Sequence, residues 1–461
     1  MLTNSDKKRS RFQILITKYI EQVRLWFSLD IQELLSASFI IMLFKILGAL
    51  CGFFVSVLIT RQLSIADVGI YFLLMSFISI FSVVSHVGLE NAITREVASY
   101  SQLNKYHQIK LIYHSALQLI LIFGTLLGLS LFLFKPQVLE QLNISLEHSY
   151  YFVIVLPLLS ALFSLQVQVF QGLRAVKSYA ILNIITRPLH LLLLLALIFL
   201  LNKLTVFSIL VSFTIALLMG MLLAHYYWRQ YLKSKKQNLA TSTLTTEQKS
   251  NTKSNLYALL PPMWLASLFA IVMEQGGQFF VGLLSTPQES ALYGVAFRIA
   301  LIVSFVVISF NNALAPKYAQ LFSSGALLRL KQLYIKDTII RVAILLPALL
   351  LLINFSHLVL SFFGERYIAA NNTLMWLMLG YMINTITGPT GMLLMMANLH
   401  KLQRNNLFVS VMVLVSFAWF LIPLYGAVGA AQSVCLAMII NNVLGMYQTI
   451  RHIFSRCSPL N

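Results

Sequence analysis

The chain contains 461 residues, of which 59% are hydrophobic and only 10% charged, whereas a soluble globule of this size needs far more polar surface. Apolar runs of about 20 residues recur along the whole length, each long enough to cross a bilayer core of about 30 Å. The formal charge of +19 does not indicate a nucleic-acid-binding protein, because the cations lie mostly in segments expected on one side of a membrane. The composition predicts an all-α polytopic membrane protein.

Residues 1–33 are neither a transmembrane span nor a cleavable signal peptide, since they contain no uninterrupted apolar run and no small-residue cleavage site. Apolar side chains recur there at helical spacing, with cations and amides on the opposite side. This pattern predicts an amphipathic helix lying on the inner leaflet. An unstructured basic leader is the alternative.

Twelve apolar segments follow, and each is expected to form a transmembrane helix. The first six are 34–60, 68–89, 111–134, 149–173, 181–201 and 204–226, and the second six are 257–284, 291–315, 337–363, 373–397, 406–424 and 427–449. We therefore expect an N-lobe over 34–227 and a C-lobe over 257–449. The stretch 228–256, rich in Lys, Ser and Thr, is expected to be a cytoplasmic linker, and 450–461 a cytoplasmic tail.

The distribution of cations predicts the orientation in the membrane. With both termini on the cytoplasmic side, most lysines and arginines fall in inner segments, and outer segments hold only Arg61, Lys135, Lys203 and Arg366. Short loops rich in Lys and Arg stay on the cytoplasmic side, so the inverted topology is disfavoured.

The two halves repeat one plan at an offset of about 225 residues. Gly69 falls on Gly294 at that offset, and Gly172 falls on Ala397. Because six spans precede the linker, the second half enters the membrane from the same side as the first. The sequence predicts two six-helix lobes related by a pseudo-two-fold axis along the membrane normal, with a cavity between them, as in transporters built by duplication.

Two ionisable residues lie near the middle of equivalent spans. Lys45 is eleven residues into the first span, which places it roughly 16 Å along a helix, and Glu274 lies similarly in the seventh. An ionisable side chain at that depth is costly and usually faces a cavity or a partner. We expect Lys45 on the substrate path and Glu274 in coupling or gating. The alternative is an ion pair between them that only locks the lobes together.

Three further polar residues are candidates for the substrate path: Arg298, Asn312 on the same helical face, and Gln278 beside Glu274. Arg298 has the alternative of snorkelling to the outer surface. The cations at membrane depth outnumber Glu274, which favours an anionic substrate group over a cationic drug.

Three charges near the inner ends of spans are expected at the membrane surface. Arg187 is expected to snorkel there, and Arg341 and Glu90 to act as interfacial anchors. Pro389, within Thr385-Ile386-Thr387-Gly388-Pro389-Thr390-Gly391, removes a backbone hydrogen bond and predicts a kink that is either a gating hinge or a fixed bend.

Motifs of enzymes and of cofactor sites are not found in the sequence. It contains no nucleotide-binding glycine-rich loop, no Cys or His cluster with metal spacing and no serine-hydrolase elbow. We expect no catalytic residue, no cofactor and no metal site, and therefore no enzyme.

Three segments resemble one family of membrane transporters. They are Gly69-Ile70-Tyr71 with Gly88-Leu89 and Arg95, Leu292-Tyr293-Gly294-Val295-Ala296-Phe297-Arg298-Ile299, and Leu421-Ile422-Pro423-Leu424-Tyr425-Gly426-Ala427-Val428-Gly429-Ala430-Ala431. With the twelve-span frame, the chain from about Leu34 to Gln448 resembles the polysaccharide transporter family, which includes the Wzx-type O-antigen flippases. That family belongs to the MOP flippase superfamily, together with the lipid II flippases and the MATE drug exporters.

The resemblance implies a flippase with a central cationic cavity. It would move a polyprenyl-diphosphate-linked oligosaccharide, such as an O-antigen or lipopolysaccharide repeat unit, from the inner to the outer leaflet by alternating access. The resemblance also implies the bacterial inner membrane, with other polysaccharide-assembly membrane proteins as candidate partners.

The source of energy and two other functions stay open. Without an ATPase motif, transport would depend on H⁺ or Na⁺ coupling, for which Glu274 is the candidate, or on consumption of the product outside. A MATE-like ion-coupled small-molecule exporter is the first alternative. A membrane glycosyltransferase or polymerase is the second, although the chain has no loop large enough for a catalytic domain.

Overall fold

A computed structural model of the chain describes residues 29–137, 147–201, 204–235 and 245–457. All regular structure in these ranges is helical. Ten of the described helices are long and apolar enough to cross a membrane. The predicted amphipathic helix at 1–33 lies almost wholly outside the described residues, as do residues 236–244 of the predicted linker and the end of the tail.

The first half of the chain forms eight described helices. They are α2 (Leu29–Gln62), α3 (Ile65–His86), α4 (Leu89–Gln102), α5 (Tyr106–Leu133), α7 (Glu147–Gly172), α8 (Val176–Ile184), α9 (Thr186–Leu201) and α10 (Val206–Ser234).

The second half begins at α12 and contains longer helices. Its elements are α12 (Thr246–Leu284), α13 (Pro287–Ser323), α14 (Leu327–Asn354), α15 (Ser356–Ser361), η1 (Glu365–Ala370), α16 (Asn371–Thr387), α17 (Thr390–Met396), α18 (His400–His452) and η2 (Phe454–Cys457). Although α18 is continuous in hydrogen bonding, Gly426 inside it has φ 54° and ψ −127°, so two helices meet there. This is the position at which the sequence predicts the link between the last two spans.

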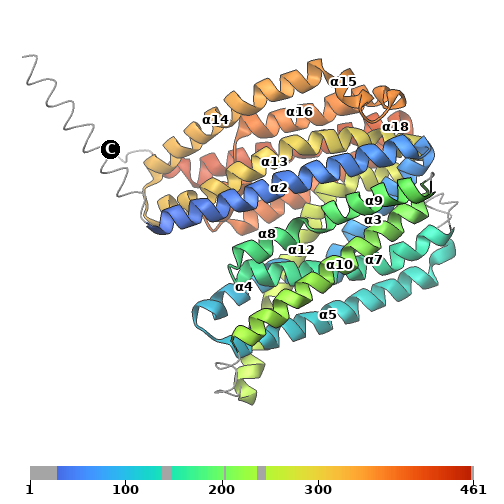
Figure 1. Cartoon of the computed structure of the whole chain (residues 1–461). Helices are drawn as coiled ribbons and strands as arrows, with labels where there is room; N and C mark the ends of the chain where they lie inside the picture. The colour runs from blue at the N-terminus through green and yellow to red at the C-terminus, as the bar shows by residue number, and fades with distance from the viewer. Residues whose placement is uncertain (1–28, 138–146, 202–203, 236–244, 458–461) are drawn as a thin grey trace, which may run out of the picture.

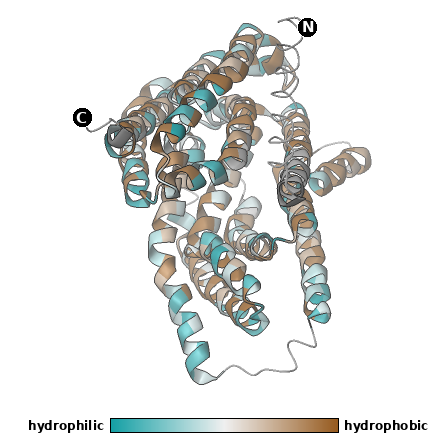
Figure 2. Cartoon of the chain, turned by 90° about the vertical axis from the view of Figure 1, so that its left-hand side faces the viewer, coloured by the Kyte–Doolittle hydropathy of each residue, from teal (hydrophilic) through white to brown (hydrophobic). Residues whose placement is uncertain are grey.

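The helices extend beyond the predicted apolar segments into polar sequence. α10 continues to Ser234 and α12 begins at Thr246, where Thr245 caps it, so helix occupies much of the stretch predicted to be a linker. Figure 2 shows these two helices projecting from the bundle with hydrophilic ends, joined by the grey trace. A helix that satisfies its own backbone hydrogen bonds needs no apolar surroundings, so apolar length alone underestimates helix length.

The amphipathic helix α4 is absent from the sequence-based prediction, because its composition is too polar for a span. It follows a sharp turn at Val87 and Gly88, which have φ of 49° and 78°. A Cβ on Gly88 would lie 2.5 Å from the Leu260 carbonyl oxygen and 2.6 Å from the Trp264 nitrogen, both in α12. The backbone of the first half therefore meets that of the second half closely at this turn.

The two halves pack together through α3, which contacts both α12 and α13. A Cβ on Gly69 in α3 would collide with the Pro287 carbonyl oxygen of α13, and a Cβ on Gly294 in α13 would collide with the Phe72 ring of α3. The two glycines that match at the sequence offset thus each lie against the other half. Figure 1 shows α4 to α10 gathered on one side and α13 to α18 on the other, with α2 along the boundary between them.

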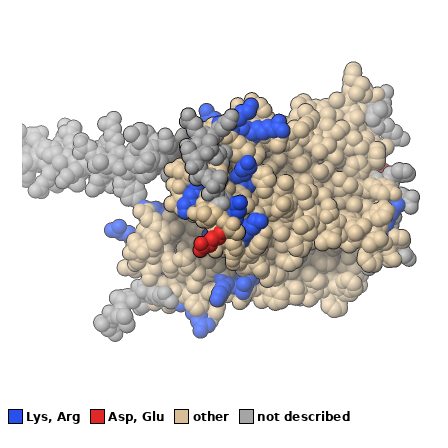
Figure 3. Space-filling view, turned by 90° about the horizontal axis from the view of Figure 1, so that it is seen from below, with Lys and Arg blue, Asp and Glu red and all other residues tan. Residues whose placement is uncertain are grey.

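The outer surface of the helices is apolar, as a lipid environment requires. Phe199 and Leu200 on α9 are 86% and 72% exposed, and large apolar side chains are also exposed on α5, α14 and α18. On the face shown in Figure 3, Lys and Arg gather toward the end of the molecule at which α10 and α12 are joined, and few lie toward the opposite end.

Candidate functional site

Arg298 lies where α2, α3 and α13 meet. Its Nε donates to Ser56 Oγ of α2 at 3.0 Å, and its Nη1 donates to the Gly294 carbonyl at 3.1 Å. The guanidinium carbon lies 3.5 Å from the centroid of the Phe72 ring, a cation–π contact. These contacts direct Arg298 to the interface between the halves and not to the outer surface.

Its remaining nitrogen, Nη2, makes no hydrogen bond to any residue that the structure describes. The two bonded nitrogens and the ring hold the guanidinium plane in one orientation. A planar group with a donor left over is suited to an anionic oxygen, such as that of a phosphate.

A second cationic group lies along α2. Arg187 of α9 extends over two small residues of that helix, since a Cβ on Gly48 would lie 3.2 Å from its Nη1 and a Cβ on Gly52 would lie 3.8 Å from its Cδ. The half-buried Lys45 is one turn away, within electrostatic range of Arg187. The Arg187 side chain is exposed and runs along α2 from Gly52 toward Gly48, so its expected snorkelling to the membrane surface stays a prediction.

Glu274 of α12 lies within electrostatic range of Arg187, on the opposite half of the chain. Its side chain is exposed although it lies in the middle of a transmembrane helix, and it accepts a hydrogen bond from Gln275 Nε2 at 3.4 Å. It forms no ion pair with Lys45, since the one ion pair within the described ranges joins Arg341 to Asp337. The locking pair proposed as the alternative is therefore not formed in this structure.

Gln278 is 2% exposed and serves the packing of the halves. Its Nε2 donates to the Ser290 carbonyl at 3.1 Å and to Ser290 Oγ at 2.8 Å, and that hydroxyl donates to the Gly69 carbonyl at 3.1 Å. The structure thus places Gln278 in a buried connection from α12 through α13 to α3. The backbone of Asn312 is within α13, but its side chain lies outside the described part of the chain.

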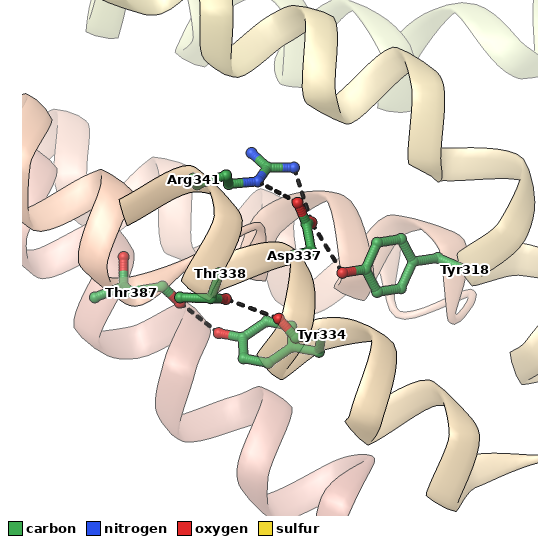
Figure 4. A network of polar contacts seen from close by, with 6 residues as sticks. All are labelled: Tyr318, Tyr334, Asp337, Thr338, Arg341 and Thr387. Atoms are coloured by element: carbon green, nitrogen blue, oxygen red, sulfur yellow. Dashed lines mark hydrogen bonds and ion pairs between the residues drawn. The ribbon is translucent and has the colours of Figure 1, made fainter. Parts of the chain in front are cut away.

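Pro389 lies with Gly388 in a break between α16 and α17. The helix ends at Thr387, and Gly388 has φ 73°. The Tyr334 hydroxyl of α14 donates to the Thr387 carbonyl, which the break has deprived of its helical partner. A Cβ on Gly388 would collide with Thr338 Oγ1, so the broken backbone lies directly against α14 (Figure 4).

The same part of α14 holds a buried ion pair. Arg341 Nε donates to Asp337 Oδ1 at 2.7 Å, its Nη2 donates to Oδ2 at 3.0 Å, and the Tyr318 hydroxyl also donates to Oδ2 at 3.0 Å (Figure 4). Burial, and then the neighbouring Asp337 carboxylate, raise the pKa of Tyr318, so its hydroxyl keeps the proton that it donates. The predicted interfacial anchoring of Arg341 is wrong, since its side chain is only 2% exposed.

Glu90, at the start of α4, is also held by protein groups. Its Oε1 accepts from Ser164 Oγ at 3.3 Å and from Gln168 Nε2 at 3.5 Å, both on α7. The prediction that it anchors at the membrane surface missed these neighbours, which are 74 and 78 residues away in the sequence. Among the described residues, no group of three or more His, Cys, Asp and Glu side chains could hold a metal ion.

Structural comparison shows the fold of MOP superfamily transporters. An inward-facing multidrug resistance MATE transporter of that superfamily is 11% identical, with 90% of this chain and 96% of that chain covered and a TM-score of 0.72. For an outward-facing MATE transporter the identity is 11%, the coverage 91% and 94%, and the TM-score 0.61. A MOP superfamily transporter from Pyrococcus furiosus, whose binding pocket of reverse polarity suggests a different function, is 13% identical, with coverage of 91% and 94% and a TM-score of 0.63.

Sequence comparison gives the family. No curated protein matches the chain significantly. The family model described as polysaccharide biosynthesis protein matches residues 34–322, which is more than half of the chain. The chain therefore belongs to the polysaccharide biosynthesis protein family, and it is a multi-pass membrane protein with the fold of MOP superfamily transporters.

Proposed function

We propose that this transporter moves a polyprenyl-diphosphate-linked oligosaccharide, an O-antigen or related surface polysaccharide unit, from the inner to the outer leaflet by alternating access. The observation that carries the proposal is the set of cations between the two halves. Lys45 lies on α2, and Arg187 of α9 and Arg298 of α13 reach the same helix, with Glu274 as an acid in range of Arg187. In a polysaccharide biosynthesis family, a diphosphate is the anion that such cations suit.

The architecture that we propose has twelve spans in two six-helix lobes. The ten candidate spans become twelve when α18 is divided at Gly426 and α16 with α17 is counted as one more. The lobes correspond to residues 34–227 and 257–449. The reciprocal contacts of Gly69 and Gly294 support a pseudo-two-fold axis between them, because equivalent residues must then meet the opposite lobe in the same way.

The conformation that we propose is inward-facing. The TM-score is 0.72 against the inward-facing MATE transporter and 0.61 against the outward-facing one. The contacts of Gly69 and Gly294 lie near the first turns of α3 and α13, which the predicted topology places outside. Lobes in contact at the outer end leave the inner end to receive substrate.

Glu274 is the residue that we propose for coupling to H⁺ or Na⁺. It is a carboxylate at membrane depth, is exposed, and is within electrostatic range of Arg187, so binding a cation there would change the electric field that the substrate anion meets.

We further propose the bacterial inner membrane, with both termini cytoplasmic, as the location of this protein. Other polysaccharide-assembly membrane proteins are its proposed partners.

Deletion of the gene tests the proposed cargo. The strain should lose surface polysaccharide and accumulate lipid-linked repeat units in the inner leaflet, and the wild-type gene should restore both. The variant Arg298→Ala should fail to restore them at normal protein level, whereas Lys135→Ala, at the outer end of α5, should succeed. Unchanged surface glycan in the deletion strain would refute the proposal.

A MATE-like small-molecule exporter is the second candidate, because MATE transporters share the fold. It predicts that deletion changes resistance to cationic dyes with no change in surface glycan. The same strains measure both outcomes.

A further inference from the structure

Two arginines join the halves of the chain at the end opposite to the α10–α12 connection. Arg61, in the last turn of α2, donates from Nε to the Phe362 carbonyl at 2.8 Å. Arg366, in η1, donates from Nη2 to the Thr60 and Leu63 carbonyls, each at 2.6 Å. Each half thus contributes one guanidinium to backbone carbonyls of the other. We call this pair of contacts the arginine clasp.

The carbonyls that Arg366 binds are those that the end of α2 leaves without partners. The last carbonyls of a helix accept no intrahelical hydrogen bond and carry a partial negative charge. A guanidinium placed between two of them satisfies both and complements that charge. The contact is therefore stronger than an ordinary surface hydrogen bond, and it is made to the backbone, so its position is fixed by the fold.

Aromatic side chains hold the clasp segment in place. Phe363, next to the carbonyl that accepts from Arg61, is fully buried, and its ring packs edge-to-face on Phe53 of α2 at a centroid distance of 5.2 Å. Arg366 also lies over the ring of the buried Tyr367, with 5.3 Å from its guanidinium carbon to the centroid. These rings anchor the η1 segment, while the two guanidinium groups remain exposed at the rim.

The clasp lies above the cationic site on the same helix. Moving along α2 from the clasp toward the site, Ser56 meets Arg298 of the second half, whereas Gly52 and Gly48 meet Arg187 of the first half. These contacts of the second half thus lie between Phe53 and Leu63, in the last part of α2 and just after its end. Separation of the halves at this end requires that the clasp contacts break.

We propose that Arg61 and Arg366 form a reversible latch that keeps the outer end of the passage closed, and that its release exposes the cationic site to the outside. This inference rests on the alternating-access part of the proposed function and is independent of the cargo. On release, the charge-assisted hydrogen bonds of both arginines are replaced by hydrogen bonds to water. The equilibrium between the closed and the released latch therefore responds to substitution of either arginine.

Cys51 provides a reporter for the test. It lies on α2, about 15 Å from Arg61 along the helix axis, and within electrostatic range of Arg187. With Cys435 and Cys457 replaced by Ser, a membrane-impermeant maleimide reports access to Cys51 from each side, in right-side-out and in inside-out membrane vesicles. No substrate is needed, so failure of the proposed cargo would leave this result interpretable.

The double variant Arg61→Ala/Arg366→Ala should label from the outside at least about tenfold faster than its parent, since one charge-assisted hydrogen bond changes an equilibrium constant by roughly that factor. Labelling from the inside should slow. Lys135→Ala is the matched control, because Lys135 contacts only Tyr151 of its own half in the described structure and should leave both rates unchanged.

Charge-conserving variants separate the latch from general instability. Arg366→Lys keeps the charge but replaces the planar guanidinium with a single ammonium, so outside labelling should rise to between the parent and the double variant. If the double variant does not reach the membrane, the labelling rate of Arg366→Lys alone tests the latch. Outside labelling equal to that of the parent, in either variant present at parental level, would overturn the proposal.

Discussion

Removing one member of the buried Asp337–Arg341 pair should destabilise the protein more than removing both. The two side chains are joined by two hydrogen bonds and are no more than 2% exposed, so neither finds water when its partner is lost. Leaving one charge of such a pair uncompensated costs about 3–5 kcal/mol, whereas exchanging the whole pair for apolar residues is often neutral. Tyr318 also loses its acceptor when Asp337 is replaced, and an unpaired buried hydroxyl costs about 1–3 kcal/mol.

The assay is the melting temperature of the purified protein in detergent. It is measured by heating samples and recording, by fluorescence-detected size-exclusion chromatography, how much protein remains in the native peak. Asp337→Leu should lower it by roughly 3–10 °C, given the cost of the unpaired charge and the size of the chain. Asp337→Leu/Arg341→Met should recover most of that loss, and adding Tyr318→Phe should recover more. A double variant that melts as low as Asp337→Leu alone would refute the reasoning, since the loss would then come from packing and not from an unpaired charge.

Three other predictions concern the interface between the halves. Arg298→Lys should retain less than a tenth of the glycan export of the wild type, because an ammonium cannot hold the Ser56 and Gly294 contacts and bind a phosphate together; export near wild type would contradict that geometry. Glu274→Gln should abolish dependence of export on the ion gradient at unchanged protein level, and gradient-dependent export in that variant would remove Glu274 from coupling. Gly69→Ala should lower both export and melting temperature, since a Cβ there collides with backbone, whereas Gly128→Ala, whose Cβ would lie 3.4 Å from its nearest neighbour, should be tolerated.

The helices themselves follow from the sequence because long apolar runs leave no alternative in a membrane, where every backbone polar group must be satisfied internally. The polar extensions of the helices could not be predicted in this way, since nothing in local hydropathy distinguishes a helical continuation of α12 from a coil. Only capping residues such as Thr245, which makes a reciprocal capping box with Gln248, mark the beginning of that helix.

The sequence likewise predicts the surroundings of some charged residues and not those of others. Depth in the membrane selects Lys45, Glu274 and Arg298. The structure brings Arg298 onto α2 of the other half and Glu274 within electrostatic range of Arg187 of the other half, whereas Lys45 lies near Arg187 of its own half. The prediction for Arg341 is wrong, although Asp337, four residues earlier on the same helix face, is a signal of an internal pair. The position of Arg187 could not be foreseen, because it depends on how α9 packs on α2 and on the space that Gly48 and Gly52 leave there.

The charge balance between the halves constrains the cargo more tightly than the fold does. Within the described ranges the ion pair is that of Arg341 with Asp337, so Lys45, Arg187 and Arg298 form none with the residues described there, and Glu274 lies only within electrostatic range of Arg187. Water compensates their charge while the passage is open, but closure around a cargo removes that water, and an uncompensated cation then costs several kcal/mol. This balance supports the proposal that the cargo brings negative charge to the site. A diphosphate does so, whereas a cationic drug would add to the repulsion, and a neutral sugar without its phosphates would leave the cations unpaired.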